Sequence, residues 1–322
     1  RTREPGQYVL TGSQQWSVLK SASESLAGRT VFLDLHGFSL SEIAESPTEE
    51  HWLKRYIEDP LGFVAALPHT PQRLEPGRTL YEQLWRGFLP EADRLDEEWI
   101  PDFHTAYVRT YIERDARMLS DVSDWQLFGR FVRLAAALTA QEVNNSQVGR
   151  DVGVTPQTAR RWLDTLTATF QWVEAPPWHG STVKRISRKP KGYFADPGVA
   201  SSLQMISSPR ALAGHPLAGP LFETAVVGEV RKLAGTLTTP PSLYHWRTHS
   251  GAEVDLLFER DGRFYPIEIK LTARPARRDA RGISALRETY PNLDIAPGLV
   301  ICPVERAQRL SESDYALPWD SR

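Results

Sequence analysis

The sequence has very few sulfur-containing residues and no long apolar run. Its 322 residues include one cysteine, Cys302, and two methionines. A single cysteine cannot form a disulfide within the chain, which excludes the small disulfide-stapled proteins of oxidising compartments. No apolar stretch approaches the roughly 18 residues that cross a bilayer as a helix. These absences predict a cytoplasmic protein that has no membrane partner.

A second absence concerns nucleotide binding. The phosphate-binding pattern G-x-x-x-x-G-K-[ST] occurs nowhere, and no apolar run ending in paired acids precedes Ser13. The backbone and the lysine of that pattern hold phosphates, while nearby side chains hold Mg²⁺. We therefore expect no ATP binding or hydrolysis by this chain alone. Because the chain begins with Arg1 rather than Met, we also expect that an upstream segment is missing.

Length and composition predict several ordinary globular domains. The chain exceeds the usual length of about 100–200 residues per domain. Hydrophobic residues make up 41% and charged residues 24%, which excludes collagen-like and disordered chains. The net charge of −2 conceals two basic clusters, which suit either a phosphate backbone or a solvated loop. Their members are Lys184, Arg185, Arg188, Lys189 and Lys191, and then Arg274, Arg277, Arg278, Arg281 and Arg287.

The spacing of apolar residues and of proline predicts a multi-domain α/β protein. Strand-like runs near the start are typical of the tail of an α/β unit, and a helical pattern follows that is clearest over residues 104–119. Further on, helices with a helix-turn-helix spacing precede an alternation of strands and helices. The predicted segments are 1–41, the end of an α/β unit; 42–120, a helical subdomain; 121–200, a winged helix; 205–310, an α/β domain; and 311–322, a tail.

The winged helix is predicted from the order of helices and turns. Helices are expected over Trp125–Leu138, after a cap at Asn145-Ser146, and over Gln157–Phe170, where Thr155-Pro156 supplies a cap and a first-turn proline. A recognition helix followed by a basic hairpin suits DNA binding, and a helix-turn-helix used only for protein packing is the alternative. The expected nucleic-acid contacts are Arg160, Arg161, Lys184, Arg185 and Lys189, together with Arg274, Arg277 and Arg278 of the second cluster.

The clearest chemical signal is a β-hairpin that carries acids and a lysine. Its strands and its turn are expected at Glu253–Glu259, Arg263–Ile269 and Asp261-Gly262. Period-two alternation places Glu268 and Lys270 on one face, and Asp255 lies on the paired strand. Carboxylate oxygens suit Mg²⁺, and an ammonium group can help to activate a water or neutralise a phosphate oxygen. This site would take Mg²⁺ as its cofactor.

A carboxylate from a helix would complete such a site, and two glutamates are candidates. The helix is expected over Leu221–Leu233, in which Glu223 shares a face with three valines. Glu229 lies about 120° away from that face by the 3.6-residue period. We therefore expect Glu223 at the site and keep Glu229 as the second choice. The alternative is a plain hairpin on which a glutamate and a lysine pair across a solvated face.

This combination of a helix Glu, a hairpin Asp and Glu-x-Lys resembles the PD-(D/E)xK superfamily, which has the restriction-endonuclease-like fold. The resemblance spans residues 220–305, and Val254 stands where the motif has its proline. It implies a nuclease-type core in which Asp255 and Glu268 are the metal ligands. The catalytic residues that it implies are Lys270, Glu268, Asp255 and Glu223.

Five segments in the same order resemble a prokaryotic family of AAA-type ATP-binding proteins with a C-terminal domain of unknown function. These segments are Tyr8–Gln14, Ser25–Arg29, Tyr107–Asp115, Lys189–Phe194 and Arg247–Asp255. The resemblance implies that residues 1–41 are the remnant of a P-loop core and that residues 42–120 form its lid-like subdomain. It also implies that Ser13 senses the nucleotide and that Arg29 contacts phosphate. ATP would bind only with the missing P-loop part.

These observations together predict the C-terminal portion of an AAA-type ATPase that acts on or binds DNA. The alternative is a catalytically inactive nuclease fold that recognises DNA or protein and is switched by ATP in the full-length protein. A stand-alone metal-dependent nuclease is a third hypothesis. DNA is the expected partner, and a protein partner or self-association stays open.

Overall fold

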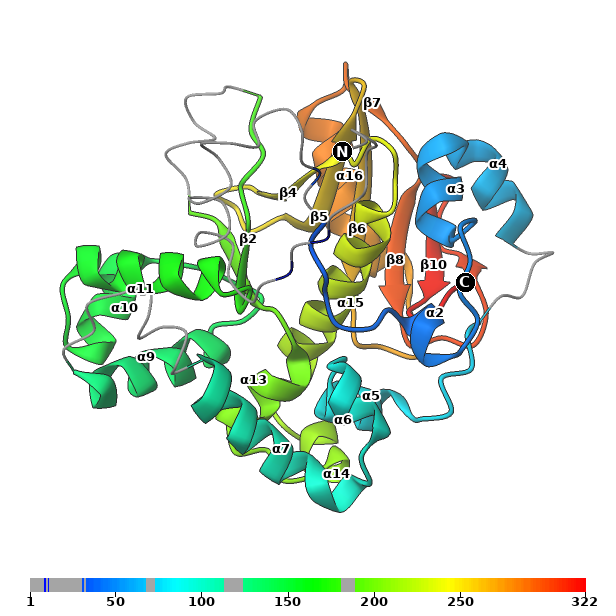
Figure 1. Cartoon of the computed structure of the whole chain (residues 1–322). Helices are drawn as coiled ribbons and strands as arrows, with labels where there is room; N and C mark the ends of the chain where they lie inside the picture. The colour runs from blue at the N-terminus through cyan, green and yellow to red at the C-terminus, as the bar shows by residue number, and fades with distance from the viewer. Residues whose placement is uncertain are drawn as a thin grey trace, which may run out of the picture.

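The computed structural model describes residues 9, 11, 31, 33–67, 73–112, 124–180 and 189–322. Over these residues the fold is mixed α/β, with helices and two sheets (Figure 1). The predicted α/β class is therefore observed, whereas most of the segment predicted as a P-loop remnant lies outside the described residues. Within the described ranges no helix is long and apolar enough to cross a bilayer.

Short helices make up the first part of the chain. They are α2 (Leu40–Ile43), α3 (Trp52–Glu58), α4 (Pro60–Ala66), α5 (Leu80–Arg86), α6 (Pro90–Arg94), η2 (Glu97–Trp99), α7 (Ile100–Tyr107) and the π turn η3 (Val108–Ile112). Proline sets several of the breaks: Asp59 ends α3 and caps α4, with Pro60 in its first turn. The helix predicted over residues 104–119 is helical as far as Ile112, and its remainder lies outside the described residues.

Three helices and a small sheet follow. They are α9 (Trp125–Ala137), β1 (Gln141–Glu142), α10 (Asn145–Val152), α11 (Pro156–Ala168), β2 (Trp172–Ala175) and β3 (Lys191–Phe194). The sheet has the order β1-β3-β2 and is antiparallel. Thr155 caps α11 as predicted, whereas α10 is capped by Asn144 rather than by the following residues. The Trp162 ring meets Phe128 and Phe131 edge-on, at centroid distances of 5.4 and 5.3 Å, and so joins α11 to α9.

The long helix α15 connects this part to the second sheet. It follows two short helices, and the three are α13 (Pro197–Leu203), α14 (Pro209–Ala213) and α15 (Ala218–Gly235). α15 also holds the segment before α2, because Lys232 Nζ donates to the Phe38 carbonyl at 2.6 Å. The same ammonium lies 4.2 Å from the centroid of the Phe88 ring. Figure 1 shows α15 between the α9–α11 helices and the larger sheet.

The larger sheet has seven strands in the order β4-β5-β6-β8-β10-β9, with β7 paired to β6. The elements are β4 (Ser242–Arg247), β5 (Glu253–Arg260), β6 (Arg263–Ile269), η4 (Arg277–Ala280), α16 (Arg281–Thr289), β7 (Asp294–Ile295), β8 (Gly298–Cys302), β9 (Gln308–Arg309) and β10 (Asp314–Pro318). β4, β5 and β6 are antiparallel, whereas β6, β8 and β10 are parallel. The predicted hairpin turn is present, with φ of +54° at Asp261 and +83° at Gly262.

The C-terminal residues belong to this sheet. Residues 311–322 were expected as a tail, but β10 pairs in parallel with β8 along its whole length. Ala316, Leu317 and Trp319 are buried there. The expectation fails because β10 is short, ends at a proline, and finds its partner through parallel pairing that leaves no local signal.

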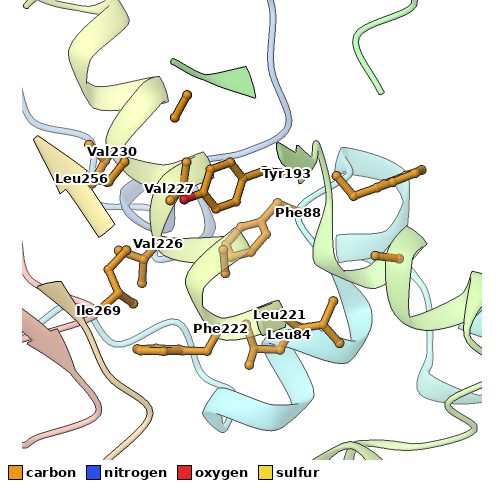
Figure 2. Packing of buried hydrophobic residues seen from close by; sticks show 14 of the residues in the cluster. Leu84, Phe88, Tyr193, Leu221, Phe222, Val226, Val227, Val230, Leu256 and Ile269 are labelled. Carbon is orange, nitrogen blue, oxygen red and sulfur yellow. The ribbon is translucent and has the colours of Figure 1, made fainter. Parts of the chain in front are cut away.

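One buried apolar cluster extends across most of the molecule. It contains residues of α3, α9, α11, β3, α15 and the larger sheet. Figure 2 shows Tyr193 of β3 on the side of α15 that carries Val227, and Ile269 of β6 beside Val226. Both sheets therefore pack against α15, which brings β3 close to the hairpin of β5 and β6.

Candidate functional site

Asp255, Glu268 and Lys270 meet where β5 and β6 diverge. Lys270 Nζ lies 2.8 Å from Glu268 Oε2 and 3.1 Å from Asp255 Oδ2. The Ile269 amide also donates to Asp255 Oδ2, at 2.9 Å, so the carboxylate replaces a missing ladder partner. Asp255 and Glu268 are only 4% and 2% exposed. The convergence expected from strand alternation is therefore confirmed, but at a buried position.

Glu223 reaches the same place from α15. Its Oε1 accepts a hydrogen bond from the Tyr193 hydroxyl at 2.8 Å. Glu229 points elsewhere, because its Oε1 accepts from the Leu40 amide at 3.0 Å. The choice of Glu223 over Glu229 from the helical period is confirmed.

Lys191 of β3 lies at the centre of these acids. Its Nζ is 2.6 Å from Glu223 Oε1, 2.7 Å from Glu253 Oε1 and 2.9 Å from Asp255 Oδ1. The residue is 3% exposed. We call Lys191, Glu223, Glu253, Asp255, Glu268 and Lys270 the acid–lysine cluster.

Sequence reasoning missed Lys191, Glu253 and the cluster's neighbour Tyr193. Lys191 was placed in a basic run that suited nucleic acid or a solvated loop, yet it begins a strand that is buried throughout. A signal was present, since lysine is followed directly by Gly-Tyr-Phe. Gly192 admits close packing, because a Cβ there would lie 2.0 Å from the Trp172 ring. A lysine that starts such a strand needs acids nearby.

Helix α16 covers another side of the cluster. A Cβ at Gly282 would lie 1.6 Å from the Glu253 carbonyl oxygen and 2.2 Å from Glu268 Oε1. Only glycine lets the first turn of α16 approach so closely. The cluster is therefore enclosed by β3, α15 and α16, and Lys270 is its most exposed member.

The charges of the cluster shift its pKa values in opposite directions. Burial raises the pKa of Glu223 to about 7, and the negative charge of Asp255 adds to the rise. Burial and Asp255 also raise the pKa of Glu268 well above its usual value. Burial alone would raise the pKa of Asp255, but Lys191 and Lys270 hold it well below its usual value. Four acids face two ammonium groups, so Glu268 and Glu223 take up protons first.

The arrangement of oxygens in the cluster can be compared with the coordination geometry that Mg²⁺ prefers. That ion prefers about six oxygens in an octahedron at roughly 2.1 Å. Here Lys191 and Lys270 already contact all four acids, including both oxygens of Asp255. In the described part of the chain no three His, Cys, Asp or Glu residues form a group that could hold a metal ion. With Lys191 in place, these residues do not fit Mg²⁺.

An arginine row follows Lys270 on the surface. It consists of Arg274, Arg277, Arg278 and Arg281, which are all exposed. The only acid within this stretch is Asp279, whose carboxylate accepts from the Ala276 amide at 2.8 Å. The row therefore gives a positively charged surface next to the exposed end of the cluster.

The other residues predicted to contact nucleic acid differ in whether the structure leaves their charge exposed. Arg161 is exposed on α11, and Lys189 is exposed just before β3. Arg160 contacts Asp164 at 2.7 Å and Glu174 at 3.0 Å, so its charge is already paired. Lys184 and Arg185 lie outside the described residues, as do Ser13 and Arg29.

Two family models match the chain. Residues 218–321 match a domain of unknown function (DUF4143), and residues 77–210 match another domain of unknown function (DUF8612). Lys191 falls in the second match and the other members of the acid–lysine cluster fall in the first, so the cluster joins the two matched regions. A C-terminal domain of unknown function is thus found where the sequence predicted one.

Curated relatives extend the comparison. The chain is 28% identical over 317 residues to an uncharacterized protein of Mycobacterium bovis and, equally, to one of Mycobacterium tuberculosis. The match covers 98% of this chain and 63% of each relative, so the chain spans less than two thirds of their length. No solved structure matches the chain.

Proposed function

We propose that this chain is the nucleic-acid-recognition part of a larger ATP-dependent protein, and that it binds DNA without cutting it. The observation that carries the proposal is the arginine row beside the acid–lysine cluster. None of its four arginines forms an ion pair with another described residue. Unpaired guanidinium groups suit a phosphate backbone, because each can donate two parallel hydrogen bonds to phosphate oxygens.

The α9–α11 helices and the small sheet support the same proposal. Their chain order and antiparallel sheet agree with a winged helix, with α11 as the recognition helix and the β2–β3 hairpin as the wing. In this proposal Arg161 and Lys189 contact phosphate, whereas Arg160 serves to hold α11 against β2. The contacts predicted for Lys184 and Arg185 stay predictions.

The absence of cleavage in this proposal rests on Lys191. A nuclease of the PD-(D/E)xK type needs its carboxylates for a metal, and here an ammonium group contacts Glu223 and Asp255. The nuclease-like hairpin then serves as a rigid base for the arginine row. This is the inactive recognition fold that the sequence analysis left as the alternative.

The ATP-dependent part of the proposal rests on the resemblance to AAA-type proteins and on the greater length of the curated relatives. Nucleotide binding would then belong to a part of the protein outside this chain, because the chain has no phosphate-binding motif. The roles of Ser13 and Arg29 stay predictions.

The test is the binding of a short labelled DNA duplex at several salt concentrations. Arg277→Ala with Arg278→Ala should weaken binding and lower the slope of log affinity against log salt by about two units, roughly one per lost cation. Arg263→Ala is the matched control, since Arg263 pairs with Asp294 at 2.7 Å at the other end of β6. If the double variant binds as tightly as the control, the arginine row does not contact DNA.

A metal-dependent nuclease is the second candidate. It is favoured by the contacts of Lys270 with Glu268 and Asp255, which agree with the motif. The same protein should be incubated with supercoiled, junction and single-stranded DNA in Mg²⁺ or Mn²⁺. We expect no nicking. Nicking that disappears in Lys270→Ala would favour the nuclease and reject the non-cleaving proposal.

A further inference from the structure

The position of Lys191 indicates a structural role that is separate from DNA recognition. The residue belongs to the small sheet, yet its side chain ends among carboxylates of α15 and the larger sheet. We propose that Lys191 is the built-in cation of the acid–lysine cluster, which takes the place of a metal ion and fastens β3 to the nuclease-like hairpin. This inference depends only on the geometry of the cluster and holds whether or not the chain binds DNA.

The hydrogen-bonding capacity of the ammonium group supports this assignment. A lysine ammonium has three N–H donors and no acceptor. Lys191 Nζ donates to Glu253 Oε1 at 2.7 Å and to Asp255 Oδ1 at 2.9 Å, and it forms an ion pair with Glu223 Oε1 at 2.6 Å. These distances are typical of charge-assisted N–H···O bonds and exceed the roughly 2.1 Å of Mg²⁺–oxygen bonds.

The other described cations at the cluster have their own contacts, and Arg247 Nη1 lies 3.6 Å from Glu253 Oε2. Lys270 is engaged with Glu268 and with the second oxygen of Asp255. Without Lys191, the carboxylates of Glu223, Glu253 and Asp255 would face one another without their common counter-ion. A buried charge that loses its partner is strongly destabilising. The cluster therefore requires a cation, and β3 supplies it.

The same strand supplies a second contact. The Tyr193 hydroxyl donates to Glu223, two residues after Lys191. Successive strand residues alternate in direction, so Lys191 and Tyr193 leave β3 on one face. Any displacement of β3 from α15 would withdraw both groups and leave the acids open to another cation.

Replacement of the charge tests the proposal. Lys191→Met keeps an unbranched chain of similar size and removes the ammonium group, and Lys189→Met is the control at an exposed position. With a chelator present, Lys191→Met should melt roughly 10 °C below the wild type, and Lys189→Met should melt with the wild type. Millimolar Mn²⁺ should restore part of the loss in Lys191→Met and leave the other two proteins unchanged.

A second variant keeps the test decisive if Lys191→Met does not fold. Lys191→Met with Glu223→Gln removes one charge of each sign and keeps an acceptor for Tyr193. It should melt above Lys191→Met and show no response to Mn²⁺. The proposal is overturned if Lys191→Met is as stable as the control, if the double variant is no more stable than the single one, or if Mn²⁺ stabilises the wild type. DNA binding is measured separately, so its failure leaves this result intact.

Discussion

Two glycines with opposite surroundings show how closely the acid–lysine cluster is enclosed. Gly282 lies in the first turn of α16, and a Cβ there would meet the Glu253 carbonyl oxygen at 1.6 Å. That oxygen belongs to the backbone of β5 and cannot turn aside as a side chain could. Gly228 lies within α15, where the nearest atom to an added Cβ is the Ala195 carbonyl oxygen at 4.0 Å. The same substitution should therefore have opposite effects at the two positions.

We predict that Gly282→Ala lowers the free energy of unfolding by about 3 kcal/mol, because α16 must shift away from β5. Gly228→Ala should raise it by up to about 1 kcal/mol, since alanine has the higher helix propensity and space is available. Urea denaturation of both variants gives the two values from the midpoints. Equal effects of one sign would contradict the packing of α16 described here.

The residues of the cluster differ in how far the sequence could reveal them. Asp255, Glu268 and Lys270 follow from the two-residue period of a local hairpin, and Glu223 follows from the helical period of α15. Lys191 comes from a different sheet, and its contacts lie 32, 62 and 64 residues away in the chain. No local period carries that information, so its basic neighbours suggested a nucleic-acid contact instead.

At the scale of elements, α3 begins with an unusual cap. His51 Nδ1 accepts from the Lys54 amide at 3.2 Å, which leaves Nε2–H to donate to Thr236 Oγ1 at 3.0 Å. The cap needs an unprotonated Nδ1, whereas Nε2–H is a donor in the neutral and in the charged ring. Burial and the charge of Lys54 lower the pKa of His51 from 6.5 to about 4. Protonation would therefore remove the acceptor that caps α3.

This cap predicts a loss of stability in mild acid. The folded protein binds fewer protons at His51 than the unfolded chain, so stability is full above pH 6.5 and falls as the pH drops towards 4. We expect a loss of about 2 kcal/mol over that range, after allowance for solvent screening. His51→Asn keeps a good cap and removes the titration, so its stability should change less. The exposed His249→Asn is the control and should follow the wild type; identical curves for all three proteins would refute the role of His51.

The elements that the sequence predicted best are those with local signals. The hairpin turn carries Asp-Gly, and α11 carries its own cap and proline. Among the elements that it missed are β9 and β10, whose partners are set by the order of the sheet. The pairing of β10 depends on β8, which itself pairs in parallel with β6, so it follows from the assembled sheet and not from a local sequence pattern.

At the scale of the whole molecule, contacts cross every boundary that the sequence suggested between described segments. Tyr56 of α3 donates to the Pro297 carbonyl at 2.7 Å, and Trp85 of α5 donates to the Ile206 carbonyl at 2.8 Å. The Leu74 amide donates to the Asp320 carbonyl at 2.7 Å, which ties the helical part to the chain end. The segments therefore share one core, although two separate family models cover the chain.

A shared core predicts cooperative unfolding. Chains of this length with several domains often unfold in steps, so the outcome discriminates between independent domains and one unit. We expect a single transition in urea, with the same midpoint by tryptophan fluorescence and by far-ultraviolet circular dichroism. Tryptophans report on both regions, because Trp162 and Trp172 lie with the small sheet while Trp246 and Trp319 lie with the large one.

Lys191→Met provides a second test of cooperative unfolding, because it removes a contact between the two sheets and leaves the shared hydrophobic core intact. If the sheets unfold together, the variant should lower both midpoints equally, since the lost ion contacts weaken one common equilibrium. If they unfold separately, the small sheet should separate first and the two probes should diverge. Divergence already in the wild type would show that the buried cluster does not couple the two matched regions.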